Sequence, residues 1–126
     1  MVLRGLIVRE PFATMIVQGI KKWEIRKRYT RIRGRILIIG NSYLKGAVTL
    51  ADVLGPFSVN DLDDYVNYHR VSREFLEQYS RGRQLYAWVL KDPIMFKHPV
   101  KVRIRKGAQV WVKIDESLIP SEIELI

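Results

Sequence analysis

Apolar residues recur along the chain with two spacings, a period of two that is typical of strands and a wider one that is typical of helices. A first helix is expected from Pro11 to about Gln18, with Phe12, Met15 and Ile16 forming a buried stripe that Ile20 continues. Strands are expected over residues 2–8, 23–28, 35–40, 47–53, 84–90, 94–96, 100–104 and 110–114.

Two short helices are expected as an insertion between the middle strands. Asn60 is predicted to cap the first helix, and Ser72 the second, where Val71 and Leu76 suit a hydrophobic staple. The pattern of many short strands, one early helix and a two-helix insertion predicts an α+β fold built on a small mixed β-barrel.

The stretch from Gly19 to Arg26 stands out because charged residues alternate with apolar ones at the start of a strand. Gly19 allows the chain to turn with a positive φ at little cost after the helix. The period of two then places Trp23 and Ile25 on one face. The other face carries Lys22, Glu24, Arg26 and Arg28. A carboxylate flanked by three cations on one strand face indicates a site rather than a core strand.

The charge of the chain is uneven. Its 22 Lys and Arg against 13 Asp and Glu give a net charge of +9. Residues 21–35 hold eight basic residues and only Glu24 as an acid, and residues 97–106 form a second basic run. The positive electrostatic potential of these two runs attracts polyanions. An acidic tail over residues 115–126 is expected to mask part of this potential. The alternative is the solvated, charge-rich surface of a heat-adapted protein.

Several classes of protein have no support in the sequence. The chain has no Cys, and its two histidines, His69 and His98, fit a helix stripe and a turn rather than a zinc site. No phosphate-binding loop, dinucleotide fingerprint or nucleophile elbow is present. No apolar run approaches a membrane span, and Arg4 precedes any apolar stretch that would suit a signal peptide. We therefore expect no metal, no cofactor, no membrane contact and a cytoplasmic location.

The positions Gly19, Lys21, Glu24 and Arg26 match the pattern G-x-K-x-x-E-x-R, and the chain resembles the ASCH (ASC-1 homology) family of the wider PUA-like group. Further blocks resemble the family in order, namely residues 11–13, 33–38, 46–53, 86–90 and 107–111. The resemblance spans roughly residues 2 to 113. It implies one ASCH domain over residues 1–114 with a PUA-like β-barrel, followed by the acidic tail over 115–126.

This resemblance implies an RNA- or nucleotide-binding protein that acts in RNA metabolism or translation-linked coactivation. We expect the ligand in a cleft between the Gly19–Arg26 motif and the helical insertion. Lys21 and Arg26 would contact phosphate or base carbonyl groups, and Glu24 would orient Arg26 or accept from a base amino group. The basic loop over residues 28–35 would follow the RNA backbone. The candidate binding residues are Lys21, Glu24, Arg26, Arg28, Tyr29, Arg31, Arg33, Arg35, Asn41 and Ser42.

Aromatic residues divide into two expected groups. Trp88 and Trp111 are predicted to pack in the core. Phe12, Tyr29 and Tyr43 lie closer to the motif and are the better candidates for stacking on bases.

An enzyme is the alternative. Some proteins with this type of domain resemble amidohydrolases that remove an acyl group from modified cytidine with a Lys, a Thr and a Glu. Lys21 stands at the Lys position, but Glu24 stands where the Thr is expected, which removes the hydroxyl nucleophile. Glu24 could act instead as a general base on water, with Lys21 stabilising the oxyanion and Glu74 or Glu77 facing the cleft. A ribonuclease and a protein-interaction domain are further alternatives, and the oligomeric state is left open.

Overall fold

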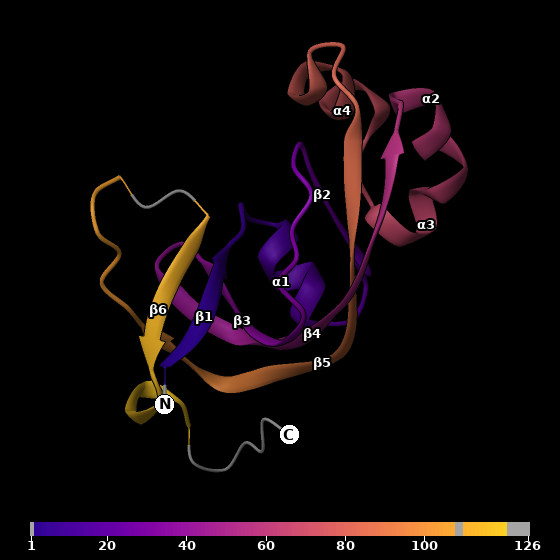
Figure 1. The fold of residues 1–126 in the computed structure, drawn as a ribbon. Helices are drawn as coiled ribbons and strands as arrows, with labels where there is room; N and C mark the ends of the chain where they lie inside the picture. Colours follow the sequence, from indigo (N-terminus) through magenta and orange to yellow (C-terminus); the bar gives the residue numbers. More distant parts are fainter. Residues whose placement is uncertain (1, 108–109, 121–126) are drawn as a thin grey trace.

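Six strands form one mixed sheet in the order β2-β5-β4-β3-β1-β6 (Figure 1). The structure is a computed structural model that describes residues 2–107 and 110–120. The strands are β1 (Val2–Ile7), β2 (Trp23–Arg26), β3 (Gly34–Gly40), β4 (Tyr43–Phe57), β5 (Leu85–Lys101) and β6 (Trp111–Asp115). Only β1 and β3 pair in parallel within this order.

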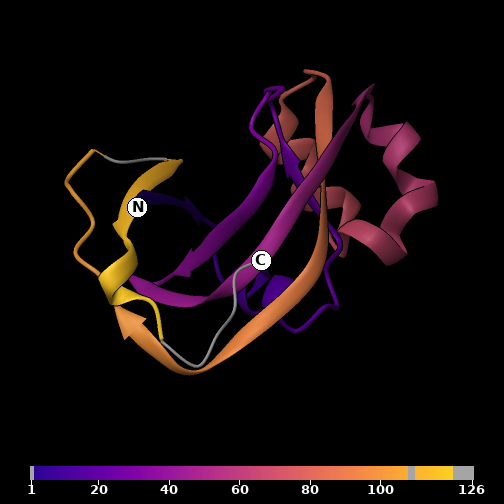
Figure 2. The same ribbon diagram turned by 60° about the horizontal axis from the view of Figure 1, so that its bottom comes forward.

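The sheet is strongly curved but, over the described residues, its edge strands β2 and β6 do not pair with each other. Figures 1 and 2 show the bend of β4 and β5 along their length. The expected α+β class with a mixed sheet is therefore confirmed, whereas a closed barrel is not.

Strands β4 and β5 are longer than the sequence predicted. Residues 84–104 were expected to form three strands, but β5 is one strand of 17 residues. Its register with β4 shifts near Pro93 and again between Met95 and Val100, the segment that holds Pro99. Irregularities of this kind let a strand bend around a residue that cannot donate to the ladder, which is why both prolines lie inside the strand.

Helix α1 (Phe12–Val17) packs against β3, β4 and β5. Its fully buried residues are Ala13, Ile16 and Val17. The predicted stripe was partly wrong, because Met15 is half-buried and Ile20 is 43% exposed. Gly19 has φ +82° and ends the helix as predicted.

The insertion contains α2 (Val59–Leu62), the 3₁₀ turn η1 (Asp63–Tyr65), α3 (Val66–His69) and α4 (Arg73–Ser80). The predicted cap Asn60 was wrong. Ser58 caps α2 and forms a reciprocal capping box with Asp61, since the helix begins earlier than its apolar spacing indicated. Ser72 caps α4 as predicted by accepting from the Phe75 amide, and Val71 and Leu76 are both buried.

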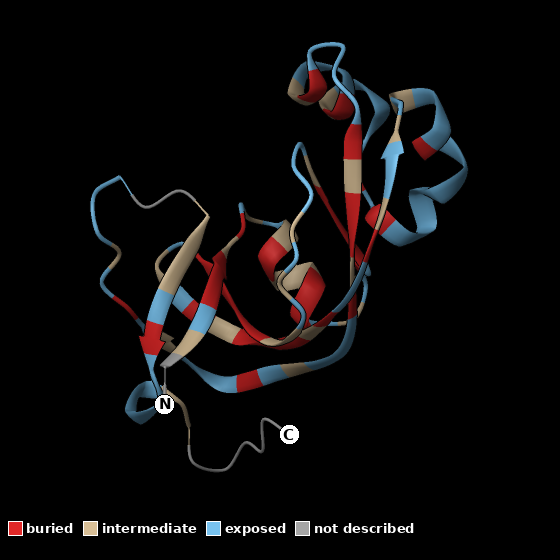
Figure 3. Ribbon diagram, viewed as in Figure 1, coloured by how far each residue is buried: buried red, intermediate tan, exposed pale blue. Residues whose placement is uncertain are grey.

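Two buried clusters meet near Phe12. One lies between α1 and the sheet and includes Trp88, which is 3% exposed. The other lies between the insertion and strands β2 and β5 and includes Trp23 and Leu76. The partly buried Phe12 packs against both clusters. Buried positions in Figure 3 accordingly gather on α1 and on the strand segments that face it.

The predicted division between a domain over residues 1–114 and a tail over 115–126 stays a prediction. Asp115 closes β6, and Glu116–Leu118 form the 3₁₀ turn η2. The rest of the expected acidic tail, residues 121–126, lies outside the described residues. In the part of the chain that the structure describes, no helix is long and apolar enough to cross a membrane.

Replacing Gly46 by Ala is expected to destabilise the fold by about 3 kcal/mol or more, measured by denaturant unfolding. A Cβ at this position in β4 would lie 2.0 Å from the Ile94 carbonyl oxygen of β5 and 2.8 Å from a methyl group of Val17. The matched control is Gly5→Ala, whose Cβ would meet the flexible end of Ile39 at 2.6 Å and should cost less. Equal losses in the two variants would contradict this packing.

Candidate functional site

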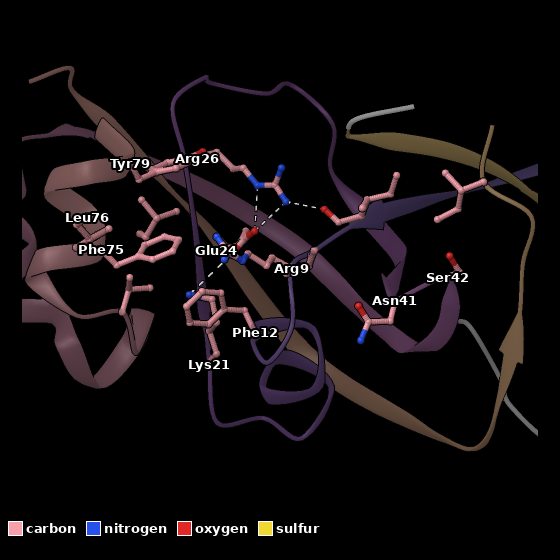
Figure 4. Close-up of a pocket in the computed structure, with 15 residues that line it drawn as sticks. Arg9, Phe12, Lys21, Glu24, Arg26, Asn41, Ser42, Phe75, Leu76 and Tyr79 are labelled. Carbon is pink, nitrogen blue, oxygen red and sulfur yellow. Dashed lines mark hydrogen bonds and ion pairs between the residues drawn. The ribbon is translucent and has the colours of Figure 1, made fainter. Parts of the chain in front are cut away.

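A cleft of about 510 Å³ opens between strand β2 and helix α4 (Figure 4). The wall on the β2 side carries Lys21, Glu24 and Arg26. Helix α4 supplies an apolar and aromatic wall with Phe75, Leu76 and Tyr79. The charged motif therefore faces the helical insertion across an open space.

Lys21 is the most buried charged residue of this wall, since the residue is only 1% exposed. Its Nζ donates a hydrogen bond to the carbonyl oxygen of His69 and lies 3.8 Å from Oε1 of Glu24. The ammonium group also lies 4.7 Å from the centroid of the Phe12 ring. The pKa of Lys21 is lowered to about 8, chiefly by burial; the Glu24 carboxylate opposes this shift and the Arg26 charge adds to it. The lysine is therefore poised to change its charge close to neutral pH.

Glu24 fixes the orientation of Arg26. One carboxylate oxygen, Oε2, accepts from Nε of Arg26 at 3.0 Å and lies 2.8 Å from its Nη2. The same Nη2 donates to the carbonyl oxygen of Ile7 at 2.8 Å, and the guanidinium lies 5.7 Å from the Trp88 ring. Glu24 is 7% exposed, so these charge-assisted bonds form away from bulk water. The result is a rigid cationic group at the edge of the cleft.

His69 holds the backbone carbonyl that receives Lys21. The imidazole is fully buried, and its Nδ1 accepts from the Val71 amide at 3.0 Å. Its Nε2 therefore carries the proton and donates to the Leu62 carbonyl oxygen at 2.8 Å. Burial lowers the pKa of His69, with a smaller contribution from the Lys21 charge. A neutral histidine thus positions the turn between α3 and α4 beside the lysine.

The sequence predicted His69 on an apolar helix stripe and gave no sign that its carbonyl oxygen would accept a hydrogen bond from Lys21. It also missed the aromatic wall, although Phe75 and Tyr79 occur at helical spacing on α4. Their rings stack at 6.2 Å between centroids, and Phe75 meets Phe12 edge to face at 5.7 Å. Spacing of i and i+4 was the available signal.

The structure brings together five of the ten predicted binding residues. Lys21, Glu24 and Arg26 share the cleft with Asn41 and Ser42. Asn41 and Ser42 form the turn between β3 and β4, with φ values of 49° and 68°, and Figure 4 shows them at the end of the cleft away from α4. They make the expected turn and line the cleft, and a contact of either side chain with a ligand stays a prediction.

The other five lie outside the cleft. Arg28 and Tyr29 line a second pocket of about 490 Å³, and Arg33 and Arg35 line a third of about 310 Å³. Arg31 is exposed and lines none of these pockets. Because β2 ends at Arg26, the alternation that was expected to continue to Arg28 stops two residues earlier.

Two of the outlying arginines make structural hydrogen bonds. Arg33 donates to the carbonyl oxygens of Thr30 and Ile32, both at 2.8 Å. Arg35 donates to the Asp92 carbonyl oxygen at 2.6 Å. Arg33 therefore helps to hold the loop between β2 and β3 in place, whereas Arg35 connects β3 to β5.

Three further predictions need correction. Glu74 and Glu77 do not line the cleft, because both are exposed on α4 and Glu77 pairs with Arg73. Tyr43 is 39% exposed and lines none of the three pockets described above. His98 lies within strand β5 rather than in a turn. Among residues 2–107 and 110–120, no cluster of three or more His, Asp or Glu side chains could hold a metal ion.

The lowered pKa of Lys21 predicts a specific pH dependence of stability. Between about pH 8 and 10.5 the folded state loses this proton while the unfolded state keeps it. The unfolded state then binds more protons, so stability rises with pH across this window. The unfolding free energy of the parent should therefore rise, relative to that of Lys21→Met, by up to about 3 kcal/mol from pH 7 to pH 10.5. A difference that stays flat across this range would contradict the burial of the ammonium group.

Comparisons with known proteins agree with this fold. The family model of the ASCH domain matches residues 6–100 of the chain. The solved structure of ASCH from Zymomonas mobilis is 20% identical with a TM-score of 0.76, and covers 90% of this chain and 88% of that one. Two single-substitution mutants of the Zymomonas mobilis protein, 22% and 21% identical, have TM-scores of 0.75 and 0.74 over 90% of this chain and 90% and 88% of theirs. No curated protein matches. The chain belongs to the ASCH domain family.

Proposed function

We propose that the cleft between β2 and α4 binds RNA or a nucleotide within it. The observation that carries this proposal is the pairing of a rigid cationic edge with an aromatic wall. Arg26 is held by Glu24 and by the Ile7 carbonyl, and the rings of Phe75 and Tyr79 lie on the opposite wall. Nucleotides combine a flat ring with phosphate and carbonyl oxygens, so they suit both walls. Membership of the ASCH family supports the same class of ligand.

The electrostatics of the cleft favour an anionic ligand. Arg9, Lys21 and Arg26 contribute three positive charges to its lining, against the single carboxylate of Glu24. Water is largely excluded around Lys21 and Glu24, which strengthens the interaction with an incoming phosphate or carbonyl group. Glu24 would orient Arg26 or accept from a base amino group, and Lys21 would supply a second donor.

Outside the cleft, the loop between β2 and β3 extends the positive surface. Lys27, Arg28 and Arg31 are exposed on it, in addition to Arg33. An RNA backbone that leaves the cleft would follow this loop, and each neutralised phosphate would release counterions. A cytoplasmic role in RNA metabolism or translation-linked coactivation is the setting that this function implies.

A salt titration of RNA binding tests the proposal. The parent should bind short single-stranded RNA with an affinity that falls steeply as salt rises. The double variant Arg28→Ala/Arg31→Ala should bind more weakly and show a slope reduced by roughly 1–2 units, since about two phosphate contacts are lost.

The matched control is Arg83→Ala/Lys97→Ala, which removes the same charge from two exposed residues that line none of the three pockets. Its slope should stay close to that of the parent. Equal effects in both double variants would show that binding depends only on total charge and would count against the loop.

Hydrolysis of an acylated nucleoside is a second candidate function, favoured by the pKa of about 8 at Lys21 and by its distance of 3.8 Å from Glu24. In this reaction Glu24 would take a proton from water, and the oxygen of that water would attack the acyl carbon. Lys21 would stabilise the oxyanion, the carbon–nitrogen bond would break, and the amine would receive the proton. Binding remains the first proposal because Oε2 of Glu24 is already engaged by Arg26.

Glu24→Gln separates the two functions when the protein is incubated with acylated cytidine and, separately, with short RNA. For a binding protein, the parent forms no product, and the variant loses roughly tenfold in RNA affinity because Arg26 is held less firmly. For a hydrolase, the parent deacylates cytidine, and the variant loses turnover while it still binds. Glu77→Gln, an exposed residue of α4, is the control that should alter neither quantity.

A further inference from the structure

The second pocket adjoins the cleft and is of similar size, about 490 Å³ against 510 Å³. Arg26 and Tyr79 line both, so these two side chains stand at the boundary between the spaces. A ligand that fills the cleft and extends past Arg26 would enter the second pocket directly. Both volumes fall in the range of sites that bind small ligands.

The lining of the second pocket combines cations and aromatic rings and contains no carboxylate among the described residues. Lys27 and Arg28 are its exposed cations, and Lys27 Nζ lies 4.7 Å from the centroid of the Tyr79 ring. Trp88 and Trp111 stack with centroids 5.9 Å apart and planes inclined by 12°. Trp88 is buried, whereas Trp111 is only half-buried at the pocket wall.

Tyr29 completes this lining although it contributes little to the core. Its side chain is 53% exposed, and its ring meets Tyr86 edge to face at 6.0 Å. Its hydroxyl accepts a hydrogen bond from Arg33 at 3.1 Å, which fixes its position beside the pocket. A large exposed ring held in one place beside cations suits stacking on a base better than packing.

We propose that the second pocket binds the nucleotide next to the one in the cleft, so that the ligand is a single-stranded RNA segment of at least two nucleotides. The phosphate that links the two nucleotides would lie at Arg26 and Lys27, on the boundary between the pockets. A duplex is disfavoured, because its bases are already stacked and cannot each enter a separate pocket. The inference rests on the proposed function of the cleft and adds the length and the single-stranded state of the ligand.

The test is to measure the affinity of the intact protein for uridylate mono-, di- and tetranucleotides that carry a 5′-phosphate, and for the matching adenylates. The dinucleotides should bind roughly 5- to 100-fold more tightly than the mononucleotides, as expected from one further stacked base. The further increase in affinity from dinucleotides to tetranucleotides should be smaller. Because stacking tolerates either base, both series should show the same step in affinity between one and two nucleotides.

Tyr29→Ala and, separately, Lys27→Ala should remove most of this step. Tyr43→Ala, which changes another exposed tyrosine that lines none of the three pockets, should retain it. Thermal unfolding of each variant verifies that it is folded.

Equal affinity for mono- and dinucleotides would overturn the inference and leave the proposed function of the cleft intact. A step that survives in both Tyr29→Ala and Lys27→Ala would also overturn it, since the second nucleotide would then bind elsewhere. No binding at any length would overturn the proposed function and the inference together.

Discussion

The buried ammonium group of Lys21 is the interaction on which the site depends. It joins three parts of the chain: the segment before β2 that carries it, the end of α3, where His69 offers its carbonyl oxygen, and α1, whose Phe12 ring lies 4.7 Å away. A buried charge is costly unless it has partners, and removing one partner of a buried ion pair typically costs about 3–5 kcal/mol. Glu24 is the charged partner here, at 3.8 Å. The fold therefore tolerates the buried charge only while all three parts are in place.

This arrangement couples the cleft to the helical insertion. His69 uses both ring nitrogens within the insertion, bonding to Leu62 on one side and Val71 on the other, so the carbonyl that holds Lys21 has a defined position. Glu24 forms ion pairs with both Lys21 and Arg26, so the position of the lysine also affects that of the guanidinium group. The aromatic wall on α4 follows directly after Val71 in the chain. Both walls of the cleft are consequently oriented by one buried network.

The sequence predicted the family, the mixed α+β fold and the motif, because these depend on local signals. Strand β3 matched its predicted range closely since a continuous apolar run between glycines has few alternatives. The sequence could not predict that the strands expected over residues 84–90, 94–96 and 100–104 form the single strand β5 as far as Lys101. This continuity depends on pairing with β4, whose register shifts several times along the strand. The burial of Lys21 was equally hidden, since a lysine before a strand is normally solvated. Arg28 lay on the predicted face by periodicity, but the early end of β2 placed it beside another pocket.

The most direct test of the central claim is a titration of ¹⁵N-labelled protein with short single-stranded RNA, followed by the backbone amide shifts. If the cleft between β2 and α4 is the binding site, the largest shifts should occur in residues 21–29 and 71–79, on its two walls. Residues 97–101 of β5, which include the exposed Lys97 and Lys101 and line none of the three pockets, should change little. Shifts confined to residues 97–101 would contradict the assignment, because they would show that RNA binds to a charged surface outside the cleft.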